Sequence, residues 1–207
     1  MNYFVTGTDT GVGKTFVTAL LVRALRKTGL NSVALKPICC GSREDVHILR
    51  AASGGELSME EMNPQYFDIE AAPLAASRNH LEPVNLDFLA AWFQSHRAQR
   101  QSLLVEGAGG WMTPLAAKQT MADLAGLFQL PVLIVVPNRL GCINHTLLTV
   151  ENIRSRGLEC AGLILNSMEK KQSLAARTNR ENLQEACAVP ILFEIHPGQQ
   201  ALELDRA

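Results

Sequence analysis

A glycine-rich stretch near the start of the chain, residues 3–15, constrains the possible fold more than any other feature. It opens with a short apolar run, residues 3–5, which predicts a buried strand, and three glycines then lead into an apolar, helix-forming run that opens at Lys14. A strand, a glycine-rich loop and a helix in this order are typical of a phosphate-binding loop. The loop N–H groups and the positive end of the new helix both favour a bound anion. The sequence therefore predicts a nucleotide site.

The glycine spacing in this loop is wider than usual. Four residues usually separate the first glycine from the Gly-Lys-Thr triplet, whereas five residues separate Gly7 from Gly13 in this chain. In such a loop Lys14 would reach the β- and γ-phosphates, and the Thr15 hydroxyl would bind Mg²⁺. The alternative is a tight strand-to-helix turn with a solvated lysine. The Gly-Lys-Thr triplet between a strand and a helix favours the nucleotide site.

Length, charge and cysteine usage narrow the class of protein. A chain of 207 residues is long enough for one sizeable α/β domain, residues 1–207, and short for two. A net charge of −1 argues against binding to nucleic acid or to a membrane surface. The five cysteines lack a C-x-x-C spacing, which predicts reduced thiols. The longest apolar run, residues 132–136, is too short to span a bilayer. We therefore expect a soluble cytoplasmic protein.

Strand-like and helix-like segments alternate along the rest of the chain. Residues 53–83 are predicted to form an irregular excursion over the ligand face, and the last ten residues are predicted to be frayed. The alternation predicts a single doubly wound α/β domain of the P-loop NTPase type, with a mainly parallel sheet flanked by helices. The expected later strands are residues 32–35, 102–106, 131–136, 161–165 and 191–193, and the expected helices include 16–27, 45–52, 85–100, 121–129, a helix ending at 156, and 172–186.

Three charged residues are predicted at the carboxyl edge of this sheet, where open parallel sheets bind their ligands. Lys36 follows the strand at 32–35, Asp45 begins a helix, and Glu106 ends the apolar strand at 102–106. A carboxylate after such a strand is costly unless a cation meets it, so Glu106 is predicted to help hold Mg²⁺. Asp45 could reach the same ion or merely cap its helix. The alternative for Lys36 is a solvated side chain before a proline.

Two further positions suggest ligand contacts. Gly141 precedes a helix start, which would make a second anion-binding terminus suited to a carboxylate. Asn166 ends the strand at 161–165 and offers one donor group and one acceptor, which can match the edge of an adenine. Its alternative role is that of a turn residue.

These motifs together resemble the dethiobiotin synthetase family over nearly the whole chain. The resemblance rests on residues 4–10 with the widened Gly-Lys-Thr loop, on Lys36-Pro37, and on residues 105–110 and 140–145. It implies an ATP- and Mg²⁺-dependent ligase of biotin biosynthesis that converts 7,8-diaminononanoate, CO₂ (or bicarbonate) and ATP to dethiobiotin, ADP and phosphate. One amine would trap CO₂ as a carbamate, which would attack the γ-phosphoryl group to give a carbamic–phosphoric anhydride. The second amine would then close the ring.

The resemblance also implies roles for single residues. Lys14, Lys36 and Thr10 would be the catalytic residues, and Thr15, Asp45 and Glu106 would bind Mg²⁺. The family resemblance implies a homodimer in which the segment around Gly141 serves the partner's substrate site. The implied nucleotide contacts are Asp9, Thr10, Gly11, Val12, Gly13, Lys14, Thr15, Phe16, Glu106, Gly109 and Asn166, and the implied substrate contacts are Lys36, Cys40, Pro73, Gly141, Cys142 and Asn144.

The chain departs from the family pattern at three places, and two other classes of protein share parts of it. Cys40 stands where many members have Ser or Thr, Gly11 replaces an acidic residue of some members, and the short loop before Asp45 makes Glu44 the alternative metal ligand. A switch-type partitioning ATPase would carry an extra lysine between Gly7 and Gly11, and none is present. A cobyrinate-type ligase usually brings a glutaminase domain, for which 207 residues leave no room.

Overall fold

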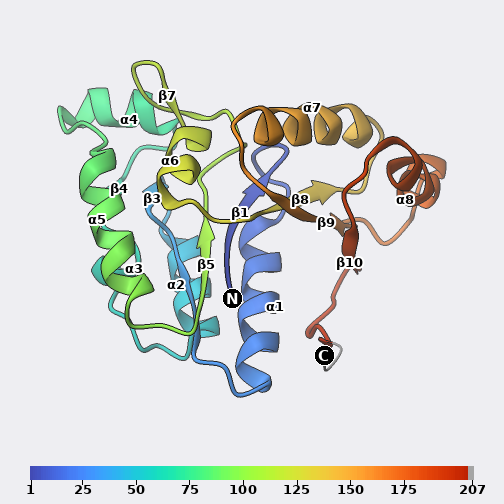
Figure 1. Cartoon of the computed structure of the whole chain (residues 1–207), viewed down its shortest axis with the longest axis horizontal. Coiled ribbons are helices and arrows are strands. Elements are labelled where there is room, and N and C mark those ends of the chain that lie inside the picture. The colour runs from blue at the N-terminus through green and yellow to red at the C-terminus, as the bar shows by residue number, and fades with distance from the viewer. Residues whose placement is uncertain (205–207) are drawn as a thin grey trace.

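The centre of the computed structural model, which describes residues 1–204, is a sheet of six parallel strands (Figure 1). The strand order is β10-β9-β8-β1-β5-β2, so the first strand of the chain lies in the middle. This arrangement confirms the predicted doubly wound, parallel α/β fold. The strands are β1 (Asn2–Gly7), β2 (Ser32–Leu35), β5 (Ser102–Glu106), β8 (Val132–Pro137), β9 (Cys160–Asn166) and β10 (Ile191–Ile195).

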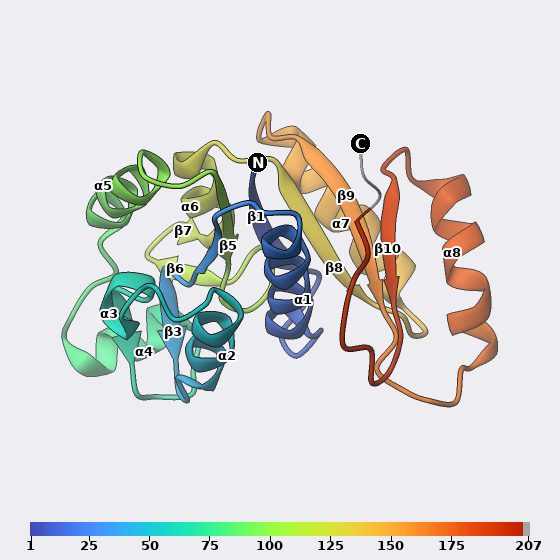
Figure 2. The ribbon, with the colours of Figure 1, turned by 90° about the horizontal axis from the view of Figure 1, so that it is seen from below.

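Helices cover both faces of this sheet, as a parallel sheet requires. Figure 2 shows α1 and α2 on one face, α6 and α7 on the other, and α8 beyond the β10 edge. The strand β8 is therefore buried along its length, which explains its uninterrupted apolar sequence. The main helices are α1 (Lys14–Lys27), α2 (Glu44–Ala52), α5 (Leu86–Arg97), α6 (Met121–Phe128), α7 (Cys142–Ser155) and α8 (Leu174–Ala186).

The segment from residue 53 to residue 83 was predicted to be irregular, and this prediction of irregular structure was wrong. It contains α3 (Met59–Met62), β4 (Gln65–Phe67) and α4 (Pro73–His80), and β4 pairs in parallel with β3 (Ile38–Cys40). These elements have only three to eight residues, too few to show a hydrophobic period in sequence. A second small sheet, β6 (Pro114–Ala116) with β7 (Gln119–Thr120), was also not predicted.

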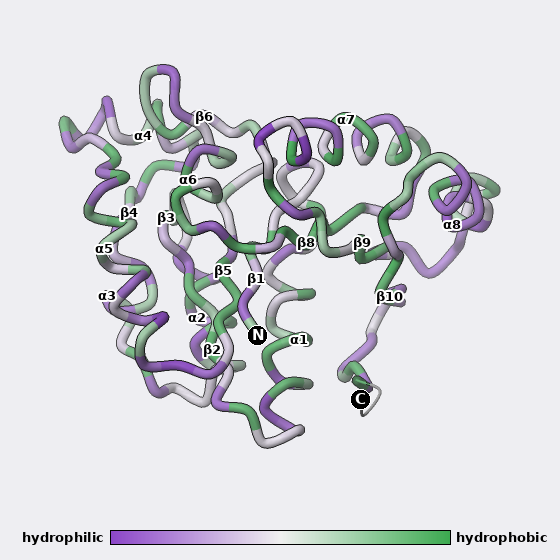
Figure 3. The backbone as a smooth tube through the Cα atoms, viewed as in Figure 1, coloured by the Kyte–Doolittle hydropathy of each residue, from purple (hydrophilic) through white to green (hydrophobic). Residues whose placement is uncertain are grey.

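Apolar sequence is concentrated in the central strands. Figure 3 shows β5, β8 and β9 as largely hydrophobic, whereas α8 is largely hydrophilic. The predicted fraying of the last ten residues holds only in part, because Leu202 is buried and Leu204 packs against the core. Residues 205–207 lie outside the described residues. Across residues 1–204, no helix combines the length and the apolar character needed to cross a bilayer.

Candidate nucleotide and metal site

The phosphate-binding loop joins β1 to α1 at the carboxyl edge of the sheet. Gly13 begins α1 with φ 85°, a left-handed conformation that favours glycine. A Cβ atom at Gly13 would also lie 2.2 Å from Nδ2 of Asn166, so a side chain has no room there. No side chain of the described part caps α1, and its first turn contains no acidic residue. The N–H groups of that turn are therefore free to bind an anion.

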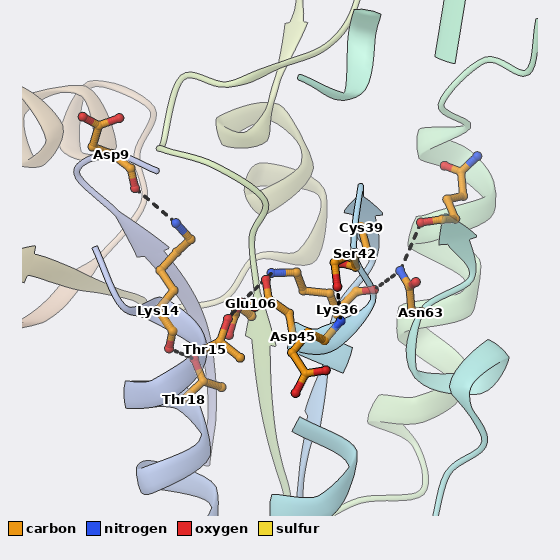
Figure 4. Close-up of polar contacts among 12 residues, drawn as sticks. Asp9, Lys14, Thr15, Thr18, Lys36, Cys39, Ser42, Asp45, Asn63 and Glu106 are labelled. Carbon is orange, nitrogen blue, oxygen red and sulfur yellow. Dashed lines mark hydrogen bonds and ion pairs between the residues drawn. The ribbon is translucent and has the colours of Figure 1, made fainter. Parts of the chain in front are cut away.

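Lys14 points back across this loop. Its Nζ donates a hydrogen bond to the main-chain oxygen of Asp9 at 3.1 Å, and the residue is only 7% exposed (Figure 4). Burial and the nearby charge of Lys36 lower the pKa of Lys14 to about 8, because both disfavour the ammonium form. A phosphate in the loop would supply the negative charge that this buried lysine lacks.

Four of the predicted residues meet in one cluster beside the loop (Figure 4). Nζ of Lys36 lies 2.5 Å from Oε1 of Glu106 and 3.0 Å from Oδ2 of Asp45. The Thr15 hydroxyl donates to the same Glu106 Oε1 at 2.8 Å. The ends of β2 and β5, the start of α1 and the start of α2 supply these side chains, so the sheet topology brings together residues that are up to 91 positions apart.

The electrostatics of the cluster are dominated by the Lys36–Glu106 pair. Burial alone lowers the pKa of Lys36, but the carboxylates of Glu106 and Asp45 outweigh burial and raise that pKa above its usual value. Burial likewise raises the pKa of Asp45, but the Lys36 ammonium outweighs it and holds that pKa below its usual range. The Glu106 side chain is fully buried, whereas 46% of the Asp45 side chain is exposed. Asp45 therefore lies at the mouth of the cluster and Glu106 at its base.

The main chain of Lys36 is held by Met62 and Asn63, which were not among the predicted site residues. Its N–H donates to the oxygen of Met62 at 2.9 Å, and its carbonyl accepts from Nδ2 of Asn63 at 2.8 Å. Asn63 is 2% exposed and also donates to the oxygen of Gln65. The only sequence signal was an Asn-Pro turn dipeptide, which does not reveal a partner 27 residues away.

The donors of this cluster fit a magnesium ion. Thr15, Asp45 and Glu106 provide hydroxyl and carboxylate oxygens, which Mg²⁺ prefers. Oε2 of Glu106 is buried and has no hydrogen-bond partner within residues 1–204, so it is available as a ligand. Asp45, and not the exposed Glu44, contacts the cluster. The described residues contain no group of three or more His, Cys, Asp or Glu side chains arranged for a metal. The remaining ligands would have to be phosphate oxygens and waters.

A second region of the sheet edge lies between the ends of β8 and β9 and the start of α8. A cavity of about 110 Å³ there is lined by residues 137–139, 166–169 and 171–173 and by Ala176. Asn166 is 3% exposed, and its Nδ2 donates to the oxygen of Val12 at 2.9 Å. This hydrogen bond ties the end of β9 to the phosphate loop and uses one of the two N–H groups of the Asn166 amide.

A network of neutral amides holds the walls of this cavity, and it was missed in the sequence. Nδ2 of Asn138 donates to the Ser167 hydroxyl at 3.1 Å and to the oxygen of Ala176 at 3.0 Å. Nδ2 of Asn179, on α8, donates to Oδ1 of Asn138 at 2.9 Å and to the oxygen of Arg139 at 3.2 Å. Asn179 is only 3% exposed. The network therefore fixes both loops of the cavity to one helix.

A larger cavity of about 510 Å³ opens on the other side of the phosphate loop. Residues 8–10, 110–113 and 148–149 and Asn152 line it, so the predicted residues Asp9 and Thr10 lie in its wall. The Thr10 N–H donates to Oδ1 of Asp9 at 2.7 Å. Gly110 packs so closely that a Cβ atom there would lie 3.3 Å from Cα of Asp9. Gly110 therefore lets this loop lie against the phosphate loop, whereas a Cβ atom at the predicted Gly109 would collide with Thr113 of the same loop.

Within residues 1–204, the other predicted residues do not hydrogen-bond to the side chains of the Lys36 cluster. Gly141 caps α7 with φ 90°, Cys142 is buried in its first turn, and Asn144 is exposed on the same helix. Burial and the neighbouring Cys39 raise the pKa of Cys40, on β3, to about 11, so its thiol is protonated at neutral pH. Pro73 is the first residue of α4, Gly11 lies at φ 70° in the loop, Val12 is a core residue and Phe16 is 40% exposed on α1.

Sequence comparisons place this chain among proteins of known name. A family model described as an AAA domain matches residues 1–202. The chain is 39% identical to the ATP-dependent dethiobiotin synthetase BioD of Akkermansia muciniphila, over 99% of this chain and 96% of that protein. It is 46% identical to the protein of the same name from Anaeromyxobacter dehalogenans, over 79% of this chain and 75% of that protein.

Solved structures share the fold at much lower identity. The signal recognition particle receptor FtsY of Elizabethkingia anophelis, in complex with GDP, has a TM-score of 0.63 and 15% identity, over 99% of this chain and 60% of that one. The septum site-determining protein MinD of Pyrococcus horikoshii, complexed with Mg-ADP, has a TM-score of 0.60 and 18% identity, over 96% of this chain and 82% of that one. These similarities establish the P-loop NTPase fold alone.

Proposed function

The chain belongs to the dethiobiotin synthetase family, and from this premise we propose that it is an ATP-dependent dethiobiotin synthetase acting in biotin biosynthesis. Its substrates are then 7,8-diaminononanoate, CO₂ and ATP, and its products are dethiobiotin, ADP and phosphate. The observation that carries this proposal beyond family membership is the cluster of Lys36, Asp45, Glu106 and Thr15 beside Lys14. It provides cations and oxygen ligands at one end of the phosphate loop.

The proposed reaction needs little acid–base catalysis from the protein. One substrate amine adds to CO₂ and loses a proton, which gives a carbamate. A carbamate oxygen then bonds to the γ-phosphorus and ADP leaves, which gives a carbamic–phosphoric anhydride. The second amine attacks the carbonyl carbon, phosphate departs with the bonding electrons, and the ureido ring closes. Both nucleophiles are supplied by the substrate, so the protein acts by orienting the reactants and by balancing charge.

Seven residues divide this work in the proposal. Lys14 pairs with the β- and γ-phosphates, a role supported by its buried position over the loop. Lys36 and Thr10 hold the carbamate and the transferring phosphoryl group in line. Thr15, Asp45 and Glu106 hold Mg²⁺, which when bound neutralises charge on the phosphate oxygens. Asn166 contacts the edge of the adenine through its side-chain amide, whose Oδ1 can accept a hydrogen bond while one N–H of Nδ2 is bonded to Val12.

The substrate contacts are proposed to involve a second copy of the chain. Cys40 and Pro73 contribute from the copy that holds the nucleotide, and Gly141, Cys142 and Asn144 contribute from the other. The start of α7 supports this homodimer, since Leu140 is 85% exposed and Leu148, two turns along, is 58% exposed. Apolar side chains mark an interface where they form a contiguous exposed patch, and in the proposed dimer these two leucines would belong to such a patch. We also propose that the chain works as one domain in the cytoplasm, where its five free thiols stay reduced.

Isotope transfer tests both the reaction and its proposed intermediate. The purified protein is incubated with Mg²⁺, ATP and ¹⁸O-labelled CO₂, with and without 7,8-diaminononanoate. The amounts and the ¹⁸O content of phosphate and of the organic product are then measured by mass spectrometry. We expect one dethiobiotin per phosphate, with one ¹⁸O atom in each. Phosphate without ¹⁸O would contradict the anhydride. Hydrolysis that does not depend on the diamine would contradict the ligase and would favour a switch-type ATPase.

A further inference from the structure

The ammonium group of Lys36 lies where the proposed metal ligands converge. Its Nζ is within 3.0 Å of one oxygen from each of Asp45 and Glu106, and the Thr15 hydroxyl donates to the Glu106 oxygen that Lys36 also contacts. The three side chains that would bind Mg²⁺ are therefore joined through this lysine and Glu106. A divalent ion bound by both carboxylates, at Oε2 of Glu106 for example, would compete with Nζ for the negative charge of the same two groups.

Electrostatics forbid the two cations from sharing this place in the ligand-free protein. Glu106 is fully buried and the Lys36 side chain is only 4% exposed, so water screens a nearby like charge poorly. A divalent ion beside an ammonium group in such surroundings would be strongly repelled. Removing the lysine without replacement is equally costly, because it would leave a buried carboxylate without a cation. The site therefore favours one cation at a time.

We propose that Lys36 is the resident cation of the divalent-metal site. Its ammonium holds Asp45 and Glu106 together while no nucleotide is bound, and it gives up these carboxylates when the metal–nucleotide complex enters. This inference rests on the proposed metal ligands Thr15, Asp45 and Glu106. It adds a positioning role to Lys36 that precedes any chemistry.

The backbone contacts of Lys36 allow this exchange. Met62 and Asn63 hold both the N–H and the carbonyl of Lys36, so the anchor of the side chain stays in place while its ammonium moves. The four methylene groups of lysine give the head group several rotamers from one fixed Cα. The phosphates and the carbamate of the proposed reaction would supply new negative partners. Metal loading would thereby direct Lys36 towards the reacting groups.

The first test measures Mn²⁺ binding without nucleotide, by the loss of the free-ion electron paramagnetic resonance signal. The protein variants are the full chain, Lys36→Met and Lys14→Met. Lys14→Met is the matched control, because it removes one buried positive charge from the same site but no contact with either carboxylate. We expect Lys36→Met to bind Mn²⁺ at least about tenfold more tightly than the full chain. Lys14→Met should change the affinity less than about threefold.

Three outcomes would overturn the proposal. Equal Mn²⁺ affinity in the full chain and Lys36→Met would mean that Lys36 does not occupy the site. Equal gains in Lys36→Met and Lys14→Met would mean that net charge alone sets the affinity. Tight Mn²⁺ binding by the unaltered chain would mean that the lysine poses no obstacle.

A second measurement decides the matter if Lys36→Met does not fold. The ¹⁵N signal of the Lys36 ammonium in the unaltered protein, assigned by its loss in Lys36→Arg, is followed during addition of a non-hydrolysable ATP analogue and then Mg²⁺. We expect the signal to move on addition of Mg²⁺, and an unmoved signal overturns the proposal. Neither experiment uses product formation, so a failed ligase assay and a failed cation exchange remain distinguishable.

Discussion

Two regions along the carboxyl edge of the sheet flank the phosphate loop, and they are built from opposite chemistry. The charged cluster consists of Lys14, Thr15, Lys36, Asp45 and Glu106, and four of these five side chains are ionisable. The amide pocket consists of Asn138, Asn166, Ser167 and Asn179, which are neutral and interact through directed hydrogen bonds. The difference indicates that one region responds to charge and the other to shape.

The largest expected effect comes from removing charge from the charged cluster while leaving the amide pocket unchanged. Glu106→Gln keeps the size of the side chain but leaves Lys36 with one carboxylate and weakens the proposed metal ligand set. We expect kcat/KM to fall by about 10³, while adenosine binding through the amide pocket changes little. Steady-state kinetics and calorimetry measure the two effects. An enzyme with unchanged turnover would remove Glu106 from the proposed site.

A second change alters the positioning of the cluster without touching its charge. Asn63→Leu removes the hydrogen bonds to the oxygens of Lys36 and Gln65. Because those buried acceptors lose their donor, we expect the free energy of unfolding to fall by about 2 kcal/mol. Turnover should fall by about tenfold as Lys36 loses its fixed anchor. Denaturant unfolding and kinetics on the same sample test this, and a loss of stability with full activity would contradict the positioning role.

The amide pocket can be altered while the charged cluster is left unchanged. Asn179→Ala removes the donor to Asn138 and to the oxygen of Arg139, so the loop after β8 loses two of the three hydrogen bonds that tie it to α8. We expect KM for ATP to rise by about tenfold with a smaller change in kcat. Pyrophosphate, which has no base, should inhibit this variant and the unaltered protein equally. A parallel loss of pyrophosphate affinity would mean that the two regions are not separable.

The smallest expected effect is the difference in salt dependence between ligand binding at the charged cluster and ligand binding at the amide pocket. Raising NaCl from 0.05 to 0.5 M should weaken pyrophosphate binding by about fivefold, because mobile ions screen the charges that it meets. Adenosine binding should change by less than about twofold, since adenosine itself carries no formal charge. Calorimetric titrations at the two salt concentrations measure both ligands. Equal salt dependence would show that charge also controls the amide pocket.

The same contrast explains what could be predicted from the sequence. The sequence predicted the order of strands and helices, the phosphate loop and the candidate residues Lys36, Asp45 and Glu106. Each of these is indicated by a local pattern, such as glycines before a helix or a charged residue beside the end of a strand or the start of a helix. The fold class was predicted correctly for this reason. Contact between Thr15 and Glu106 followed only from the topology, which places two strand ends side by side.

Apart from Asn166, the residues of the amide pocket and the anchor of Lys36 could not be predicted in this way. Asn63, Asn138 and Asn179 bond to main-chain oxygens or to each other over 27 to 41 residues. An asparagine in a turn or on a polar helix carries no signal of such a partner, since the same residue is common there for local reasons. The short elements of residues 53–83 were missed because three-residue strands have no readable period.

The central place of β1 has a consequence for how the protein is made. Its strand neighbours are β5 and β8, so residue 4 pairs with residues 105 and 132. Residue 132 follows residue 4 by 128 positions, so β1 gains its second neighbour long after its own synthesis. Contacts this distant in sequence slow folding. During synthesis the apolar strand β1 therefore lacks β8 as a neighbour for longer than it lacks β5. In that interval aggregation competes with folding, and chaperones protect nascent chains.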